Sequence, residues 1–469
     1  MIRPLLSLTL ILPGTADAFC GTYVGSAGSE LYNSSSQIVV AREGTRTHLT
    51  LANDFEGNAS DFAMVVPVPA LLGPDDVKIV DPAILARIDA YSAPRLVSYT
   101  CDELYPTSYG NGQWHGGNGG NGATEYGESG GCGCAAAAPM VGHDTAVGID
   151  PDTDTDTDAD SDTDADADSD SPLTPDAIDT VEVEAEFAVG EYEIVILSAE
   201  ESEGLILWLN LSGYAIPYET EATLSEYIQA GSYFIAAKVT LDDVLTDAQY
   251  LSPLRVSYDS DVVSLPIRLG ALNSRGAQNL TIFAINDAAD GKVGIANHIE
   301  VGIENECMYD PDRYESFGDF YKERLRAAMD IGGPLGAWTT EYSWQPTKCD
   351  PCTDDGPLTD SDAGNLGFSS GASSAHFTRL RVHYTPAQAH QDLVLYSSGR
   401  ASQEQARYIA YRDELGESFP VCGLGFQPSG TCWDDPPPPA ASATPAKRIP
   451  GRAGLLLFGF ALLAGIRRR

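Results

Sequence analysis

Alternation of apolar and polar residues recurs along the chain and predicts β-strands. The segment "VEVEAEFAV" places Val181, Val183, Ala185, Phe187 and Val189 on one face and Glu182, Glu184 and Glu186 on the other. A period of two is typical of a half-buried strand. The same interpretation applies to "SQIVVARE", "RTHLTLA", "DFAMVVPV", "EYEIVIL", "SYFIAAKVTL", "LTIFAIN" and "FTRLRVHYT". We expect a mainly β, antiparallel, sandwich-like fold with a few peripheral helices, and keep an α+β fold as the alternative.

Helical periodicity marks three further segments. Asp81 can cap a helix that begins at Pro82 and stops before Pro94. A short helix is predicted in "EATLSEYIQAG", where Gly231 closes it. The segment "ESFGDFYKERLRAAM" has one apolar face that should pack on a sheet, formed by Phe317, Phe320, Tyr321, Leu325 and Ala328.

Periodicity is lost over residues 102–178. This stretch is first glycine-rich and then, from Asp150 to Asp170, has aspartate at every even position. Such a sequence buries too little apolar surface to offset its ordering entropy, and like charges extend it. Calcium loops also alternate acidic residues, but they need a glycine turn and apolar anchors that this tract lacks. We expect a disordered spacer that attracts divalent ions only weakly.

Composition excludes one class of partner. The chain has 469 residues, of which 43% are hydrophobic, and a formal charge of −41. This size allows a sizeable buried core. Nucleic-acid binding needs clustered Lys and Arg, so nucleic acid is excluded as a partner.

The N-terminus predicts export. Arg3 precedes an apolar stretch from Leu5 to Leu12, and Ala16 and Ala18 form the small-residue pattern of a signal-peptidase site. We therefore expect a signal peptide over residues 1–18. Lipidation at Cys20 is disfavoured, because the residue before it is the large Phe19.

The C-terminus predicts a membrane-directed tail. A proline-rich spacer over residues 434–452 leads to the apolar stretch Ala453–Ile466 and then to three arginines, Arg467 to Arg469. As a helix the apolar stretch would be about 21 Å long, shorter than a hydrocarbon core of about 30 Å. Residues 453–469 resemble the sorting tails of Gram-negative envelope proteins, although they lack the cysteine and the Pro-Glu-Pro motif of well-known versions. We expect at least transient membrane anchoring with the arginines on the cytoplasmic side.

Several long blocks resemble the domain-of-unknown-function 2330 family of exported bacterial proteins. They are "FCGTYV", "LTLANDFEGNASDFAMVVPVP", "DPAILARIDAYSAPRLVSY", "FAVGEYEIVILSAEESEGLILWLNLSGYAIP", "SLPIRLGALNSRGAQNLTIFAIND" and "EYSWQPTKCDPC". The resemblance implies one family domain, with a first part over 19–101 and a second over 179–433, interrupted by the insertion. It also implies export and frequently a membrane-linked tail, with no established activity.

Nine cysteines in an exported chain predict disulfides. The sharpest motif, Cys349-Asp-Pro-Cys352, favours a structural disulfide, with a metal half-site or a redox pair as alternatives. Cys132 and Cys134 could complete a zinc site with it. Cys422 and Cys432 flank a Gly- and Pro-containing loop and are predicted to pair. The remaining disulfide candidates are Cys20 and Cys101.

Catalytic motifs are missing from the sequence. It has no Gly-x-Ser-x-Gly, no Gly-x-x-x-x-Gly-Lys and no His-Glu-x-x-His. His376 and His383 have an odd spacing, so they should face opposite sides of one strand as structural residues. The loop that holds Asn53, Asp54, Asn58 and Asp61 could bind calcium, but a polar turn is favoured. We expect no catalytic residue, metal site or cofactor.

Two functions from different classes remain open. The favoured one is a non-enzymatic protein of a Gram-negative-type cell envelope, with a β-rich interaction or structural domain. Its partners would be the membrane, through the C-terminal helix, and an unidentified envelope protein or polymer. The alternative is an exported thiol-disulfide oxidoreductase that uses Cys349 and Cys352.

Overall fold

A computed structural model of the protein describes residues 22–26, 31–32, 36–53, 56–57, 61–101, 180–215, 220–240, 251–272, 274, 276–350, 352–353, 356–427 and 432. The predicted signal peptide, the Asp-rich insertion and the C-terminal tail lie outside these residues, as do Cys20, Cys132 and Cys134. None of the helices in the described ranges has the length and apolar character needed to cross a membrane.

The largest sheet is nine-stranded and mixed. Its order is β17 (Ile299–Glu300), β19 (Ala337–Trp344), β20 (Ala375–Tyr384), β15 (Gln278–Asp287), β3 (Ser36–Glu43), β4 (Arg46–Asn53), β13 (Leu254–Asp259) and β7 (Val77–Ile79), with β22 (Glu404–Gln405) on β19. Most pairs are antiparallel, but β3 runs parallel to β15 and β17 runs parallel to β19. The predicted mainly β fold is confirmed, and these two parallel pairs make the sheet mixed.

A six-stranded antiparallel sheet packs face to face with the large one. Its order is β11 (Tyr214–Ala215), β1 (Thr22–Ser26), β6 (Asp61–Val68), β12 (Tyr233–Thr240), β10 (Tyr192–Ala199) and β9 (Val181–Val189). Strand β9 lies at the edge, which explains why the apolar face predicted for it is only partly covered and Val183 is 47% exposed.

Smaller sheets complete the β structure. One contains β14 (Val263–Leu265), β21 (Leu393–Ser397) and β16 (Val293–Ile295), and a second, parallel one contains β18 (Cys307–Tyr309), β23 (Arg407–Ala410) and β8 (Arg95–Val97). A two-stranded piece pairs β2 (Leu31–Tyr32) with β5 (Glu56–Gly57).

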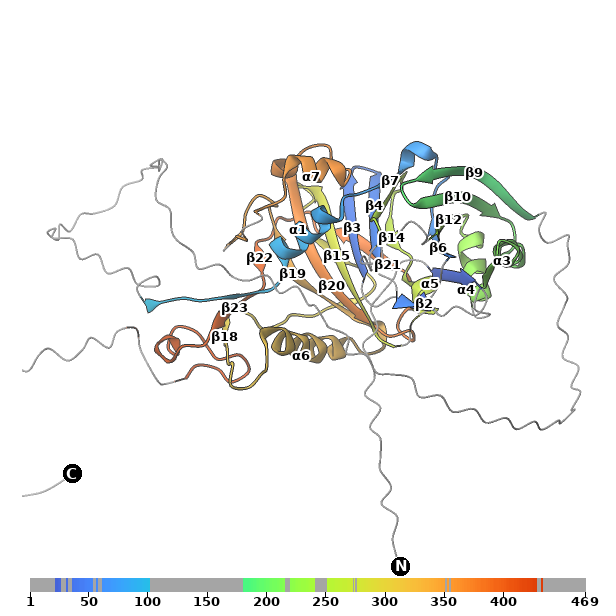
Figure 1. The fold of residues 1–469 in the computed structure, drawn as a ribbon. Helices are drawn as coiled ribbons and strands as arrows, with labels where there is room; N and C mark the ends of the chain where they lie inside the picture. Colours follow the sequence, from blue (N-terminus) through green and yellow to red (C-terminus); the bar gives the residue numbers. More distant parts are fainter. Residues whose placement is uncertain are drawn as a thin grey trace, which may run out of the picture.

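Helices lie on the outer faces of the sheets (Figure 1). They are α1 (Pro82–Ser92), α3 (Ser202–Leu211), α4 (Thr220–Gln229), α5 (Ile267–Leu272), α6 (Phe317–Met329) and α7 (Asp360–Asn365), with 3-10 turns η1 (Pro74–Asp76), η4 (Asp330–Leu335), η5 (Ala372–Ser374) and η6 (Asp413–Leu415).

The three predicted helices form as expected. The Asp81 carboxylate accepts a hydrogen bond from the Ala83 amide at 2.9 Å and so caps α1. Helix α4 ends before Gly231, which has a φ of 76°. Helix α6 packs on the parallel sheet, with the Phe320 ring 5.1 Å from that of Tyr408. Helix α3 was not predicted, because its apolar residues are nearly continuous and show no helical period.

Three apolar layers hold the sheets and helices together. The main core lies between the nine-stranded sheet on one side and the six-stranded sheet with the β14–β21–β16 sheet on the other. The opposite face of the large sheet packs against α1 and α7. The outer face of the six-stranded sheet is covered by α3, α4 and α5. The chain thus forms a β-sandwich with helices outside both sheets.

Strands from either side of the insertion share the same sheets. Among the pairs that join the two parts are β6 with β12, β4 with β13, β3 with β15, and β8 with β23. The insertion leaves after Cys101, beyond β8, and the chain re-enters at β9, at the opposite end of the molecule in Figure 1. Residues before and after the insertion therefore bury one continuous apolar core.

The predicted pairing of Cys422 with Cys432 is wrong. Cys422 bonds to Cys307 and Cys432 bonds to Cys101, while Cys349 bonds to Cys352. The reason is the parallel sheet. The Cys422 amide donates to the Met308 carbonyl at 3.1 Å, which places Cys422 beside β18, and Cys101 follows β8, the opposite edge strand of the same sheet. Nonlocal strand pairing, not the short loop, selects the partners.

Candidate functional site

The Cys349–Cys352 disulfide closes a short loop that follows β19. The two Cα atoms are 4.9 Å apart, and Cys352 is exposed while Cys349 is half-buried. Among the described residues that follow β19, the first helix is α7, which starts at Asp360. A helix N-terminus is one of the features that lower the pKa of an attacking thiol. The loop therefore lacks one structural feature of a dithiol oxidoreductase.

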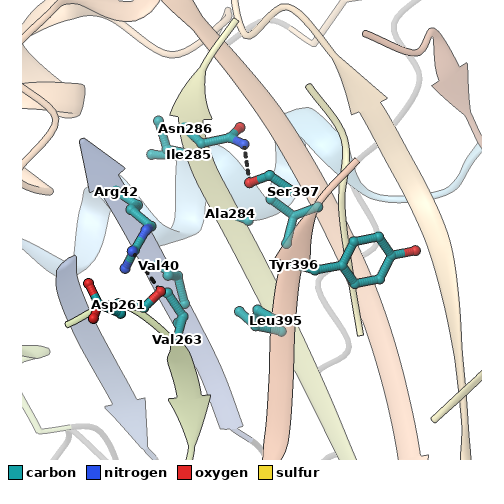
Figure 2. A pocket seen from close by; sticks show the side chains of 11 residues that line it. Val40, Arg42, Asp261, Val263, Ala284, Ile285, Asn286, Leu395, Tyr396 and Ser397 are labelled. Carbon is teal, nitrogen blue, oxygen red and sulfur yellow. Dashed lines mark hydrogen bonds between the residues drawn. The ribbon is translucent and has the colours of Figure 1, made fainter. Parts of the chain in front are cut away.

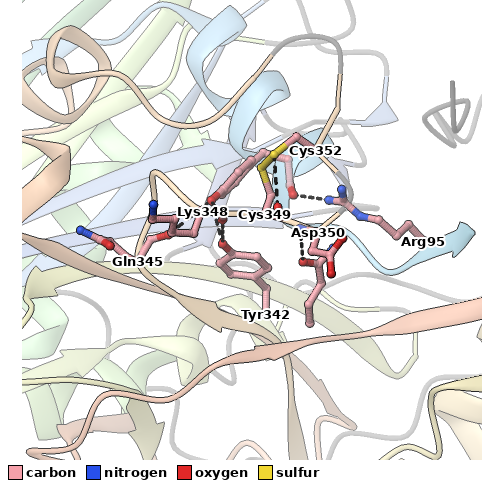
Figure 3. Close-up of a disulfide and its surroundings, with 9 residues drawn as sticks. Arg95, Tyr342, Gln345, Lys348, Cys349, Asp350 and Cys352 are labelled. Atoms are coloured by element: carbon pink, nitrogen blue, oxygen red, sulfur yellow. Dashed lines mark hydrogen bonds between the residues drawn. A yellow bond between two sulfur atoms is a disulfide. The ribbon is translucent and has the colours of Figure 1, made fainter. Parts of the chain in front are cut away.

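Two buried tyrosines contact the backbone of the loop next to the disulfide. The hydroxyl oxygens of Tyr91 and Tyr342 are 2.7 Å apart, and both lie within hydrogen-bonding reach of the Lys348 carbonyl (Figure 3). Burial raises the pKa of Tyr91 to about 12, and burial together with the neighbouring Tyr91 raises that of Tyr342. Both phenols therefore stay protonated at neutral pH and keep their protons for hydrogen bonds.

A second set of contacts holds the other side of the loop. The Asp350 amide donates to Gln405 Oε1 at 3.1 Å, and the Asp350 carboxylate pairs with Arg407 at 3.0 Å. Arg407 lies on β23 and pairs as well with Glu306, at 2.5 Å. The loop is thus a joint between α1, the large sheet and the small parallel sheet.

Beneath this joint lies a buried charge network. Glu341 on β19 bonds Arg379 at 2.5 Å, Arg381 at 3.2 Å and the Tyr321 hydroxyl at 2.6 Å. Arg379, whose side chain is 3% exposed, also pairs with Asp89 of α1 at 2.6 Å. Burial opposes ionisation of Glu341, but the charges of the two arginines outweigh it and hold its pKa at about 2. The network is ionised at neutral pH and joins α1, α6 and the large sheet.

A pocket of about 220 Å³ opens between the large sheet and β21 (Figure 2). Arg42 lies on one side, where it donates to Thr47 at 2.7 Å and to the Ser260 carbonyl at 2.8 Å. On the other side Ser397 accepts from the amide of Asn286 at 3.3 Å. An amide cannot act as a general base, so Ser397 has no base among these contacts. The pocket does not assemble a nucleophile with its activating group.

The histidines have structural partners. His376 lies 2.9 Å from the Ser343 hydroxyl, and His383 lies 2.8 Å from Asn279 Oδ1. They face opposite sides of β20, as their odd spacing predicts. Of the calcium candidates, Asn53 ends β4 and Asp61 begins β6, while Asp54 and Asn58 lie outside the described residues. Within the described ranges, no three acidic, histidine or cysteine side chains form a group that could hold a metal.

Stability should fall as the pH is lowered from 7.5 to 5. Burial lowers the pKa of His298, His376, His383 and His48, that of His48 to about 4. Below about pH 6.5, the ordinary pKa of histidine, these side chains bind protons in the unfolded chain but not in the folded chain. The free energy of unfolding therefore decreases as the pH falls. His48 contributes up to about 2 kcal/mol by pH 5, less any solvent screening. Urea unfolding followed by tryptophan fluorescence measures the slope.

The variant His48→Gln provides the control for this pH dependence. It removes the titrating ring and should flatten the slope between pH 7.5 and 5, although the other three histidines keep part of it. A wild-type stability that is constant or rises on acidification over this range would show that the buried histidines do not set the pH dependence.

Comparison with known proteins identifies a family. A family model described as "Uncharacterized protein conserved in bacteria (DUF2330)" matches residues 14–396, which is most of the chain and includes both sides of the insertion. The match ends in β21, before Cys422 and Cys432. Searches of curated proteins and of solved structures gave no match. The chain therefore belongs to the DUF2330 family of conserved bacterial proteins.

Proposed function

We propose that the protein is a non-enzymatic component of the bacterial cell envelope, exported by its N-terminal segment and held at the membrane, at least transiently, by its C-terminal segment. Its β-rich domain serves as an interaction or structural module for an envelope protein or polymer. The observation that carries the proposal is the Cys101–Cys432 disulfide. Such bonds form and persist in oxidising compartments and are rare in the cytosol.

The position of this disulfide suits a tethered domain. Cys101 immediately precedes the insertion over residues 102–178, and Cys432 lies two residues before the proline-rich spacer over residues 434–452. A force applied to the tail would be transmitted from Cys432 through the disulfide to Cys101, which follows β8. Strand β8 lies in a sheet with β23 and β18, and β18 carries the Cys307–Cys422 bond. The load is thus transferred to covalently clamped strands.

Charge and contacts support a binding or structural role. The formal charge of −41 favours solubility and makes binding depend on the charge of a partner. It disfavours binding to phosphate groups. Glu341, whose pKa is held at about 2, is bound by three side chains of the protein itself, and its side chain is only 1% exposed. A catalytic acid or base has to reach its substrate. The buried charge network around Glu341 therefore serves structure.

Export is tested by comparing intact cells, spheroplasts and lysed spheroplasts of a Gram-negative host that expresses the full chain. We expect added protease to cleave the protein in spheroplasts while a cytoplasmic marker stays intact. A variant that lacks residues 2–18 is the control and should be protected until lysis. If the full chain is protected like the marker and retains residues 1–18, the proposal is wrong.

A further inference from the structure

We propose that the Cys349–Cys352 bond is a reversible thiol-exchange site, acted on by an external dithiol, and that its reduction releases the joint between α1, β22 and β23. The site would be a substrate of thiol exchange and not a catalyst of it. The described disulfides differ in ring size and in exposure, and both differences single out this bond.

Ring size is the first difference. The bonded cysteines are 3 residues apart in Cys349–Cys352, 115 in Cys307–Cys422 and 331 in Cys101–Cys432. In the chain-entropy model, a disulfide that closes a longer loop stabilises the folded state more. By thermodynamic linkage, folding stabilises that disulfide against reduction by the same free energy. Cys349–Cys352 receives the smallest protection of the three.

Access is the second difference. Cys307 is 0% exposed and Cys422 is 5% exposed, and Cys101 and Cys432 are partly exposed. Among the cysteines of the described bonds, Cys352 is the most exposed. Exchange requires a thiolate to approach a sulfur atom, so accessible disulfides react first. Figure 3 shows the bond at the end of the loop, beside Lys348 and Asp350. An external thiol can reach Cys352 without unfolding of the sheet.

The chemistry balances with one dithiol. Its first thiolate attacks Sγ of Cys352, a mixed disulfide forms, and Cys349 leaves as a thiolate that takes up a proton. The second thiol of the same molecule then attacks the mixed disulfide and releases Cys352. The protein disulfide gains two electrons, and the external dithiol loses two and becomes a disulfide.

Opening the ring should loosen the joint. The four-residue ring fixes the positions of two groups next to the sulfur atoms: the Lys348 carbonyl, which faces Tyr91 and Tyr342, and Asp350, which contacts Gln405 and Arg407. Without the bond, forming these contacts requires a flexible loop to become ordered, which costs conformational entropy. The Asp350 amide, bonded to Gln405, is the reporter of this change.

The test uses the purified full chain in buffers of reduced and oxidised dithiothreitol, followed by maleimide labelling and peptide mapping. We expect Cys349 and Cys352 to become labelled at a low ratio of reduced to oxidised dithiothreitol. This ratio should be at least about tenfold lower than the ratio needed to label the cysteines of the other described bonds. Hydrogen–deuterium exchange at that ratio should be faster over residues 345–353 and 404–407 and unchanged in β15 and β20. Equal or later reduction of Cys349–Cys352 would overturn the proposal.

Two variants separate exchange from loosening. The double variant Cys349→Ser/Cys352→Ser should show the fast deuterium exchange without reductant and no further response to it. Asp350→Asn removes the ion pair with Arg407 and should speed deuterium exchange while leaving the labelling order unchanged. If reduction labels both cysteines but deuterium exchange over residues 345–353 does not change, the bond does not control the joint.

Discussion

Replacing Glu341 with Gln is expected to lower the free energy of unfolding by about 3–5 kcal/mol. The Glu341 side chain is 1% exposed and neutralises Arg379, which is 3% exposed, and Arg381. The amide keeps the shape but not the charge, so Arg379 would remain buried with only Asp89, which is 36% exposed, as a charged partner. An uncompensated buried charge is costly, whereas a surface ion pair contributes little.

The matched control is Glu404→Gln on β22. Glu404 pairs with Lys292 at 3.1 Å, but its side chain is 43% exposed, so its loss should cost less than about 1 kcal/mol. Urea unfolding of both variants gives the comparison. Should Glu341→Gln fail to fold, the double variant Glu341→Gln/Arg379→Met is expected to recover folding. Equal losses in the two single variants would contradict a structural role for the network.

Removing the long-range disulfides is the second large effect. Cys307→Ala/Cys422→Ala should lose about 5 kcal/mol, because the bond closes a loop whose ends are 115 residues apart. Cys101→Ala/Cys432→Ala should lose a comparable amount. The control Cys349→Ala/Cys352→Ala opens a bond between residues 3 apart and should lose at most about 2 kcal/mol.

Urea unfolding without reductant measures these losses. We expect removal of either long-range disulfide to lower the free energy of unfolding clearly more than removal of the Cys349–Cys352 bond. A short-ring variant as destabilised as Cys307→Ala/Cys422→Ala would show that loop closure does not govern the contribution of these bonds.

Local periodicity predicts the elements that form by local rules. The short apolar runs in Asp61–Val68 and in Tyr233–Thr240 become β6 and β12, and the Asp81 cap with its apolar stripe becomes α1. Helix α3 escapes prediction, since "SEGLILWLNL" packs its face through Leu205 and Leu209 but has apolar neighbours on other faces as well. Its identity depends on the sheet it covers.

Nonlocal contacts are the part that the sequence does not encode locally. The parallel pairing of β3 with β15 and the partners of Cys422 and Cys432 depend on which strands meet in space. The Cys349-x-x-Cys352 spacing does make its own pairing predictable, because its ends cannot move far apart. The burial of Glu341 could not be predicted, because a glutamate in a strand such as "AWTTEYSW" would ordinarily be assigned to an exposed position.

The most direct test of the account is a non-reducing peptide map of the protein taken from intact cells that were treated with N-ethylmaleimide before lysis. An exported, covalently clamped domain predicts linked peptides for Cys101 with Cys432 and for Cys307 with Cys422. It also predicts a mature N-terminus at Phe19. Maleimide-blocked thiols at Cys307 and Cys422, or peptides that link Cys422 to Cys432, would contradict the account.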